Sequence, residues 1–331
     1  MHAQAIDLHA HWVPPQLAQA LRQRQGQVPR LDVLTDGAER LIMPIGTLSF
    51  SQAHTDIDLR LELMSQQGIT RQMLSLPGLF GIDSLPFEQS APLVRGFNDA
   101  CAQLCQTHPE CFCGLAALPW ANMDAAVAEL RRARLELGLL GAILPVDAFR
   151  SQETAARIRP VFEAAEALGA HFFVHPGRMP DSGALPHLPP DNDLARRALA
   201  VQHEVGEAMV TLLLSDFLQP WQNITVQVAN LGGTFAAVVE RMDHMLALRD
   251  PGRAMPSSQT RGVWVDCASL GAKALEQAVS VFGADRVVLG TDCPIFDTAR
   301  TLAGIQQSRL SASDQALVLH GNAAALLARL S

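Results

Sequence analysis

Two histidines separated by one residue lie in the first apolar segment of the chain. His9 and His11 belong to AIDLHAH (5–11), a run whose length and flanks predict a strand. Residues two apart on a strand point to the same face, so the two imidazoles face one side together. Such a pair forms a chelate for Zn²⁺ or a similar ion. The alternative is two unrelated polar residues, since His-x-His alone is a common pattern.

Two more ligand-type side chains end apolar segments further along the chain. His175 lies in HFFVHP (171–176), and Asp292 closes VVLGTD (287–292). Taken singly, the first is typical of a core histidine and the second of a helix cap or turn. The argument for a metal site rests on their common position at the ends of predicted strands. Three imidazoles and one carboxylate suit one Zn²⁺ ion, with Mn²⁺ as the alternative.

Eight apolar segments bounded by turn residues predict eight buried parallel strands. They are residues 5–11, 72–77, 112–119, 142–146, 171–176, 225–231, 263–269 and 287–292. Helical patterns separate several of them, and this alternation predicts an α/β fold, a (β/α)8 TIM barrel forming one domain over residues 1–331. The carboxyl ends of barrel strands meet at one mouth, which would bring the four ligands together.

Two connections are long for a compact domain. Residues 12–58 follow the first strand and residues 177–193 follow the fifth, and we expect both to be loops at the mouth of the barrel. Arg178 and His187 lie in the second loop, where each is a candidate for substrate binding.

The composition limits the class of partner. The chain has 331 residues with a net charge of −8, and it contains no basic stripe of the kind that nucleic-acid binders carry. It contains no run of about 18 apolar residues that would span a membrane, and its start does not resemble a signal peptide. We therefore expect a cytoplasmic protein that acts on a small molecule and binds neither nucleic acid nor membrane.

The strand-end motifs resemble those of the amidohydrolase superfamily. The matching motifs are HAH (9–11), HP (175–176) and GTD (290–292). The segments LRLELMSQQGITRQMLSLP, GADRVVLGTDCP and GNAAALL are similar to the branch typified by aminocarboxymuconate semialdehyde decarboxylase and the resorcylate-type decarboxylases. The resemblance implies one divalent metal on His9, His11, His175 and Asp292. The fourth strand carries no lysine at its end, which favours a mononuclear site.

One position departs from the family pattern. The resemblance places a catalytic histidine at the end of the sixth strand, where this chain has Asn230 in VANLGGTF. An amide cannot act as a base near pH 7, although it donates and accepts hydrogen bonds. One hypothesis places Asn230 in the site as a catalytic group. The alternative makes it a turn residue before Gly232 and Gly233, since asparagine tolerates the backbone angles of turns.

The resemblance also assigns a role to Arg241, eleven residues after Asn230. In decarboxylase-type members an arginine at this spacing reaches the substrate carboxylate of a neighbouring subunit, which implies a homodimer and a carboxylic acid substrate. The alternative is a surface arginine paired with Glu240 or Asp243. Asp7 is expected to be an acceptor that supports the ligating histidines. Asp266, at the end of the seventh predicted strand, either lines the site or caps the next helix, and capping is the favoured interpretation.

Three functions fit these residues. The first is non-oxidative decarboxylation of a small aromatic or unsaturated carboxylic acid, with Asp292 carrying a proton to the reacting carbon. The second is hydrolysis of a lactone, ester or amide, with Asp292 as the base. The third is a metal-binding pseudoenzyme that lost its base at position 230. The complete ligand set disfavours the third, and the resemblance favours the first over the second.

Overall fold

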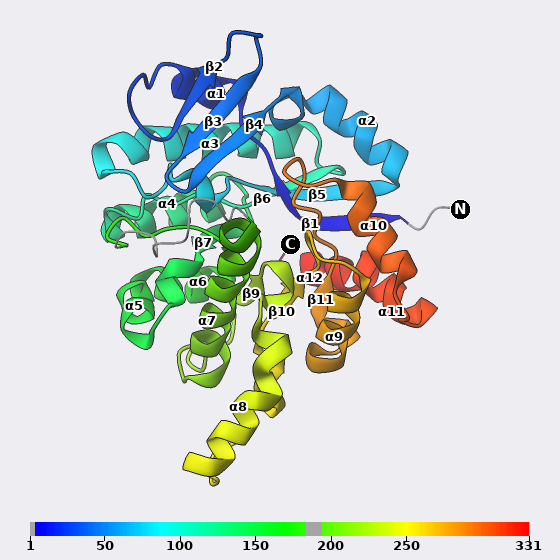
Figure 1. Ribbon diagram of the computed structural model, residues 1–331. Helices are drawn as coiled ribbons and strands as arrows, with labels where there is room; N and C mark the ends of the chain where they lie inside the picture. Colours follow the sequence, from blue (N-terminus) through cyan, green and yellow to red (C-terminus); the bar gives the residue numbers. More distant parts are fainter. Residues whose placement is uncertain (1–3, 183–193, 331) are drawn as a thin grey trace.

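The computed structural model describes residues 4–182 and 194–330 of the chain. Within those residues, eight strands pair in parallel (Figure 1). They are β1 (Ala5–His11), β5 (Ile69–Ser75), β6 (Phe112–Gly114), β7 (Gly141–Pro145), β8 (His171–His175), β9 (Thr225–Val228), β10 (Trp264–Asp266) and β11 (Val287–Val288). Each lies within or overlaps one of the predicted segments, so the expected series of parallel strands is confirmed.

The strands follow one another in space as they do in the sequence. One sheet has the order β1-β5-β6 and a second has β11-β10-β9-β8-β7. A parallel bridge between Ala116 and Ala142 joins β6 to β7, and another between Ala10 and Cys293 joins β1 to the segment after β11. Leu8 N also donates to Leu289 O at 2.9 Å. The last strand therefore lies beside the first.

Helices cover the outside of the strands (Figure 1). They include α2 (Ile57–Gln67), α3 (Phe87–Thr107), α4 (Met123–Leu135), α5 (Gln152–Arg157), α6 (Arg159–Leu168), α7 (Val201–Leu214), α8 (Phe235–Arg249), α9 (Ala272–Phe282), α10 (Thr298–Gln307), α11 (Ala312–Ala316) and α12 (Asn322–Leu330). The buried faces of α2 to α10 pack on the strands in the larger apolar cluster. A smaller cluster joins strand residues such as Leu8 and Phe173 to Leu326 of α12. No helix of the described residues is long and apolar enough to cross a membrane.

The segment expected to be a long loop after the first strand is folded, so that prediction was wrong. It contains α1 (Pro15–Arg22) and an antiparallel sheet of β2 (Arg30–Val33), β3 (Glu39–Met43) and β4 (Gly46–Phe50). These strands have four or five residues each, and charged side chains in β2 and β3 hide the apolar alternation. Leu31, Leu41 and Phe50 supply the buried positions that hold the sheet in place.

The second expected loop lies mostly outside the described residues. Residues 177–182 follow β8 without forming a helix or strand, and residues 183–193, which include His187, are not described. The strands carrying two candidate residues are also shorter than predicted. β9 ends at Val228, so Asn230 lies in a following 3-10 turn (Asn230–Gly232), and β11 ends four residues before Asp292.

Candidate metal centre

Three histidines and one aspartate converge at the carboxyl ends of the strands. His9 and His11 come from β1, His175 ends β8, and Asp292 follows β11. One ligand atom from each residue lies within 4.8 Å of the others, and all four residues are buried. The Nε2 atom of His11 is 3.2 Å from Nε2 of His9 and 3.2 Å from Nε2 of His175. The structure thus brings together the four ligands predicted from the sequence.

Irregularities in the backbone orient the side chains of the four ligands. Between Asp7 and Ala10, three steps along β1 match two along β5, an irregularity of the kind that bulges cause beside functional sites. Asp292 has a positive φ of 57°, and its N–H donates to His9 O at 2.8 Å. Gly290 permits the close approach, because a Cβ there would lie 2.7 Å from His9 Cβ and 2.7 Å from Asp266 Oδ1. The GTD motif therefore serves packing as well as ligation.

Strained backbone gathers at this end of the strands. In the described part of the chain, the non-glycine residues with positive φ are Asn230, Leu231, Ser269 and Asp292. All four follow β9, β10 or β11 within four residues of the strand end. Positive φ is costly for most side chains and is retained mainly at functional sites.

The Nδ1 atom of every ligating histidine is already engaged. Its partners are Asp266 Oδ1 at 3.0 Å for His9, Ser75 Oγ at 3.1 Å for His11 and Pro176 O at 2.9 Å for His175. The carboxylate and carbonyl oxygens accept hydrogen bonds from Nδ1–H, and His11 Nδ1 also lies 3.4 Å from the carbonyl oxygen of Ser75, so each ring when neutral has its hydrogen on Nδ1 and its lone pair on Nε2. The Nε2 lone pairs then face one another in a single small space.

The charges of the cluster fit a divalent cation. Burial lowers the pKa of His11 and of His175, so both rings are neutral. Burial also opposes charge on His9, but the carboxylates of Asp266 and Asp292 outweigh it and raise the pKa of His9 to about 10, so without a metal ion this ring holds a proton that a bound cation would replace. Burial opposes ionisation of Asp292 as well, yet the two imidazoles of β1 lower its pKa overall.

The carboxylate supplies the fourth acceptor. Asp292 Oδ1 lies 3.1 Å from His11 Nε2 and 3.5 Å from His9 Nε2, and it has no hydrogen-bond partner among the described residues. The neutral ring of His11 carries a lone pair on Nε2 and cannot donate to this oxygen. The lone pairs of His11 and His175 and the anionic oxygen of Asp292 repel one another unless a cation, either the proton on His9 or a metal ion, lies between them, so the donor set fits a metal ion.

Asp266 does not cap a helix, and that expectation was wrong. It is fully buried at the end of β10, whereas α9 begins at Ala272 after Gly271. Asp266 Oδ1 accepts from His9 Nδ1 and from backbone N–H groups, and Oδ2 accepts from Gln227 Nε2 at 3.0 Å. Its place at a strand end, like that of the four ligands, was the signal that pointed to the site.

Asp7 is an acceptor, as expected, but its donors are not imidazoles. Asp7 Oδ1 accepts from the backbone N–H of His9 at 3.1 Å and of Thr291 at 3.0 Å. Asp7 Oδ2 accepts from Thr291 Oγ1 at 2.6 Å and Gln72 Nε2 at 2.9 Å. The carboxylate thus ties β1 to the backbone before Asp292. Burial raises the pKa of Asp7 to about 6.

Asn230 borders the cluster through its backbone. Its N–H donates to Asp266 Oδ1 at 3.3 Å, the same oxygen that holds His9. Its side-chain oxygen is buried and has no hydrogen-bond partner among the described residues. With φ of 57°, Asn230 occupies a turn next to the site, as the turn interpretation expects, and its role as a catalytic group stays a prediction.

The predicted substrate-binding arginines lie in different surroundings. Arg178, three residues after His175, is largely buried and forms an ion pair in which its Nε lies 3.2 Å from Asp147 Oδ2. Arg241 is exposed on α8, where it lines a surface groove with Met242 and Met245. None of the four ligands lines this groove. Within one chain, the groove therefore does not connect Arg241 to the metal cluster.

Sequence reasoning missed two supporting side chains. Ser75 contacts His11, and Gln227 contacts Asp266. Each is a polar residue inside or ending an otherwise apolar strand, in QMLS and TVQV. A polar side chain in such a run is buried, and it needs a partner there. That is the signal by which both could have been found.

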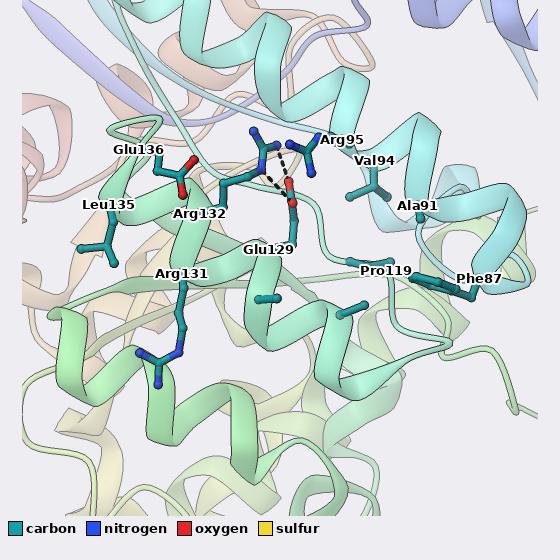
Figure 2. A pocket seen from close by; sticks show the side chains of 12 residues that line it. Phe87, Ala91, Val94, Arg95, Pro119, Glu129, Arg131, Arg132, Leu135 and Glu136 are labelled. Atoms are coloured by element: carbon teal, nitrogen blue, oxygen red, sulfur yellow. Dashed lines mark hydrogen bonds and ion pairs between the residues drawn. The ribbon is translucent and has the colours of Figure 1, made fainter.

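A second hollow in the surface is unrelated to the cluster. A groove of about 510 Å³ lies between α3 and α4. Figure 2 shows the side chains that line it, among them Arg95, Glu129 and Arg132. Arg132 Nη2 lies 2.6 Å from Glu129 Oε1, so the two charges neutralise each other. None of the four ligands lines this groove.

The chain belongs to the amidohydrolase family, whose model matches residues 6–329. Among curated relatives, it is 28% identical to the 2-amino-3-carboxymuconate-6-semialdehyde decarboxylase of Dictyostelium discoideum over 87% of this chain and 81% of that protein. It is 27% identical to the gamma-resorcylate decarboxylase of Rhodococcus jostii over 81% of this chain and 86% of that protein.

Solved structures share the fold. The 2,6-dihydroxybenzoate decarboxylase from Rhizobium superposes with a TM-score of 0.76 at 20% identity, covering 98% of both chains. The dihydroxybenzoic acid decarboxylase from Polaromonas, crystallised with manganese and 2-nitroresorcinol, gives a TM-score of 0.71 at 21% identity over 98% of this chain and 96% of that one. The amidohydrolase-type α/β fold expected from the motifs is confirmed.

Proposed function

We propose that this protein is a metal-dependent, non-oxidative decarboxylase of a small aromatic or unsaturated carboxylic acid. The observation that carries the proposal is the buried set of three Nε2 atoms and one carboxylate oxygen at the strand ends. The names of the curated relatives support the reaction, because they decarboxylate acids of this kind. The order of strand pairing supports a single (β/α)8 TIM barrel over residues 1–331.

His9, His11, His175 and Asp292 would hold one divalent ion. Three imidazoles and a carboxylate suit Zn²⁺, and the manganese in the Polaromonas structure supports Mn²⁺ as the alternative. When bound, the ion supplies a positive charge that orients the substrate carboxylate with an adjacent hydroxyl or carbonyl oxygen. Asp266, Ser75 and Pro176 fix the rings so that each presents Nε2.

The reaction exchanges a carbon–carbon bond for a carbon–hydrogen bond. The bond to the carboxylate breaks, CO₂ leaves, and the electron pair on the carbon must accept a proton. Asp292 is the candidate to carry that proton from a substrate hydroxyl or from solvent to the carbon, since it is the ionised carboxylate at the strand ends. Asn230 would orient the substrate with its unpaired amide oxygen and would transfer no proton.

Arg178, His187 and Arg241 remain the candidates for binding the acid. Arg178 follows His175 closely and already lies against a buried carboxylate, Asp147, so its guanidinium is held near the mouth. Arg241 would act from the partner subunit of a homodimer. Figure 1 shows α8 extending away from the body of the protein, and the exposed apolar side chains of Met245 and Leu248 on this helix support an interface there. A cytoplasmic location also stays a prediction.

A substrate panel tests the proposal. The protein, loaded with Zn²⁺ or Mn²⁺, is incubated with 2,6-dihydroxybenzoate, 5-carboxyvanillate and 6-methylsalicylate, and the released CO₂ is measured. A parallel panel holds lactones, esters and amides of similar size. We expect CO₂ from at least one acid and no hydrolysis. Hydrolysis without CO₂ release would establish the alternative reaction and overturn this one.

A further inference from the structure

A glutamine lies buried behind the metal cluster. Gln227, in β9, is fully buried in a strand that is otherwise apolar at its neighbouring positions. Its Nε2 donates to Asp266 Oδ2 at 3.0 Å and to Leu8 O at 3.2 Å. Both partners are acceptors, so the atom facing them is the amide nitrogen. The side chain therefore has one orientation.

Gln227 completes the set of donors around Asp266. Oδ1 of Asp266 accepts from His9 Nδ1 at 3.0 Å and from the backbone N–H of Asn230 and Ala268 at 3.3 and 3.1 Å. Oδ2 accepts from Gln227, and in residues 4–182 and 194–330 no second donor to it is found. Because Asp266 is fully buried, bulk water does not replace a lost donor.

The polar side chains continue into the interior beyond Gln227. His171, at the start of β8, lies with its Nδ1 2.8 Å from Thr225 Oγ1. Burial lowers the pKa of His171 to about 4, and the amide of Gln227 opposes the shift, so the ring is neutral. His171 Nε2 and Gln227 Oε1 are both buried without a hydrogen-bond partner among the described residues. Burying this many polar groups costs free energy unless they are paired, which argues that the series has a role.

We propose that Gln227 is a positioning residue for the metal centre. By holding Oδ2 of Asp266, it keeps Oδ1 against His9 Nδ1, and so holds the Nε2 lone pair of His9 toward the ion. Loss of the amide would free the carboxylate to rotate and His9 to follow it. The inference rests on the metal site of the proposed function, but not on the reaction.

The test replaces Gln227 by methionine, which has a similar length and no donor. The Mn²⁺-loaded protein is titrated with a chelator, and the metal that remains bound is counted. We expect Gln227→Met to release its metal at about 10–100-fold lower chelator concentration than the wild type, the range typical for residues behind a ligand. Asn98→Leu is the matched control, because Asn98 is also a fully buried amide, bonded to Ala117 instead.

A double-mutant cycle separates positioning from general destabilisation. If Gln227 acts through Asp266, Gln227→Met adds no further loss of metal to Asp266→Ala. Equal retention by Gln227→Met and wild type, an equal loss in Asn98→Leu, or a full additional loss beside Asp266→Ala would each overturn the inference. Should Asp266→Ala not fold, the comparison of Gln227→Met with Asn98→Leu decides. Failure of the wild type to bind Mn²⁺ or Zn²⁺ would instead refute the metal site.

Discussion

Replacing Asn230 discriminates between the candidate reactions. A hydrolase needs a base for the attacking water, and general base catalysis contributes about 10²–10⁴-fold. An amide supplies none, so in a hydrolase Asp292 would have to serve both as a metal ligand and as that base. Decarboxylation instead needs a proton donor for the carbon, and Asn230 has only to orient the substrate.

The structure sets the size of the effect. Asn230→Ala removes a side-chain oxygen that has no hydrogen-bond partner among the described residues and leaves the backbone N–H on Asp266. We therefore expect activity to fall by less than about 10³-fold, the scale of one lost electrostatic group. The φ of 57° adds a stability cost of about 1 kcal/mol for alanine that glycine would not incur.

The assay compares three variants in the CO₂ release assay, with bound metal measured in parallel. Asn230→Gly separates the effect of losing the side-chain amide from the effect of backbone strain, because glycine lacks the side chain and tolerates the positive φ. Equal losses in the alanine and glycine variants would assign the effect to the amide. Asn230→His should give no large gain. A large rise in turnover in that variant would show that the site has lost a base it needs, and the reasoning would be refuted.

Three further expectations address the ligands, the pH dependence and the assembly. His9→Ala, His175→Ala and Asp292→Ala should each lose bound metal and keep the fold; full metal by elemental analysis in all three would refute the assignment. Burial raises the pKa of Asp83 from 3.8 to about 7. Between pH 3.8 and about 7 the folded protein therefore binds a proton that the unfolded chain has released, so the folded protein loses stability as the pH rises through this range. Asp83→Asn should thus be more stable than wild type at pH 8, by at most about 4 kcal/mol, with no gain near pH 4 in chemical denaturation; the same gain at both pH values would contradict it. Light scattering should give a dimer, and Arg241→Ala should raise KM for the acid more than it lowers kcat; a fully active monomer would exclude the shared site.

The ligands were predictable because barrel geometry converts sequence position into spatial position. Each is a polar residue at the end of an apolar run, and parallel strands bring all such ends to one place. His9, His175 and Asp292 are 283 residues apart at most in the chain (9 to 292), yet their ligand atoms lie within 4.8 Å. To predict the cluster, it was enough to recognise which residue ends each strand. The contacts between the ligands did not have to be predicted separately.

Other features depend on interactions that no local pattern encodes. The antiparallel sheet after β1 escaped prediction because Arg30, Asp32 and Glu39 interrupt its apolar alternation, and its stability comes from packing of Leu31 and Leu41. The role of Asp266 escaped for another reason. An aspartate before a helical pattern is an ordinary cap, and only the fold places His9 within 3.0 Å of it.

The arrangement around Asp266 explains why strain and buried polarity occur at the same end of the strands. Asp266 Oδ1 accepts hydrogen bonds from His9 Nδ1 and from the backbone N–H of Asn230. The bond from Asn230 depends on the turn in which this residue has its positive φ. Relaxing that turn would remove a donor from the carboxylate that orients a metal ligand. The same hydrogen bonds that prepare the site therefore offset the strain of this turn, as expected where backbone strain serves preorganisation. A variant that relieves it, Asn230→Gly, should gain stability from the backbone while the N–H to Asp266 persists, so metal retention should stay at the wild-type level; a loss of metal in that variant would show that the asparagine side chain, and not the turn, supports the centre.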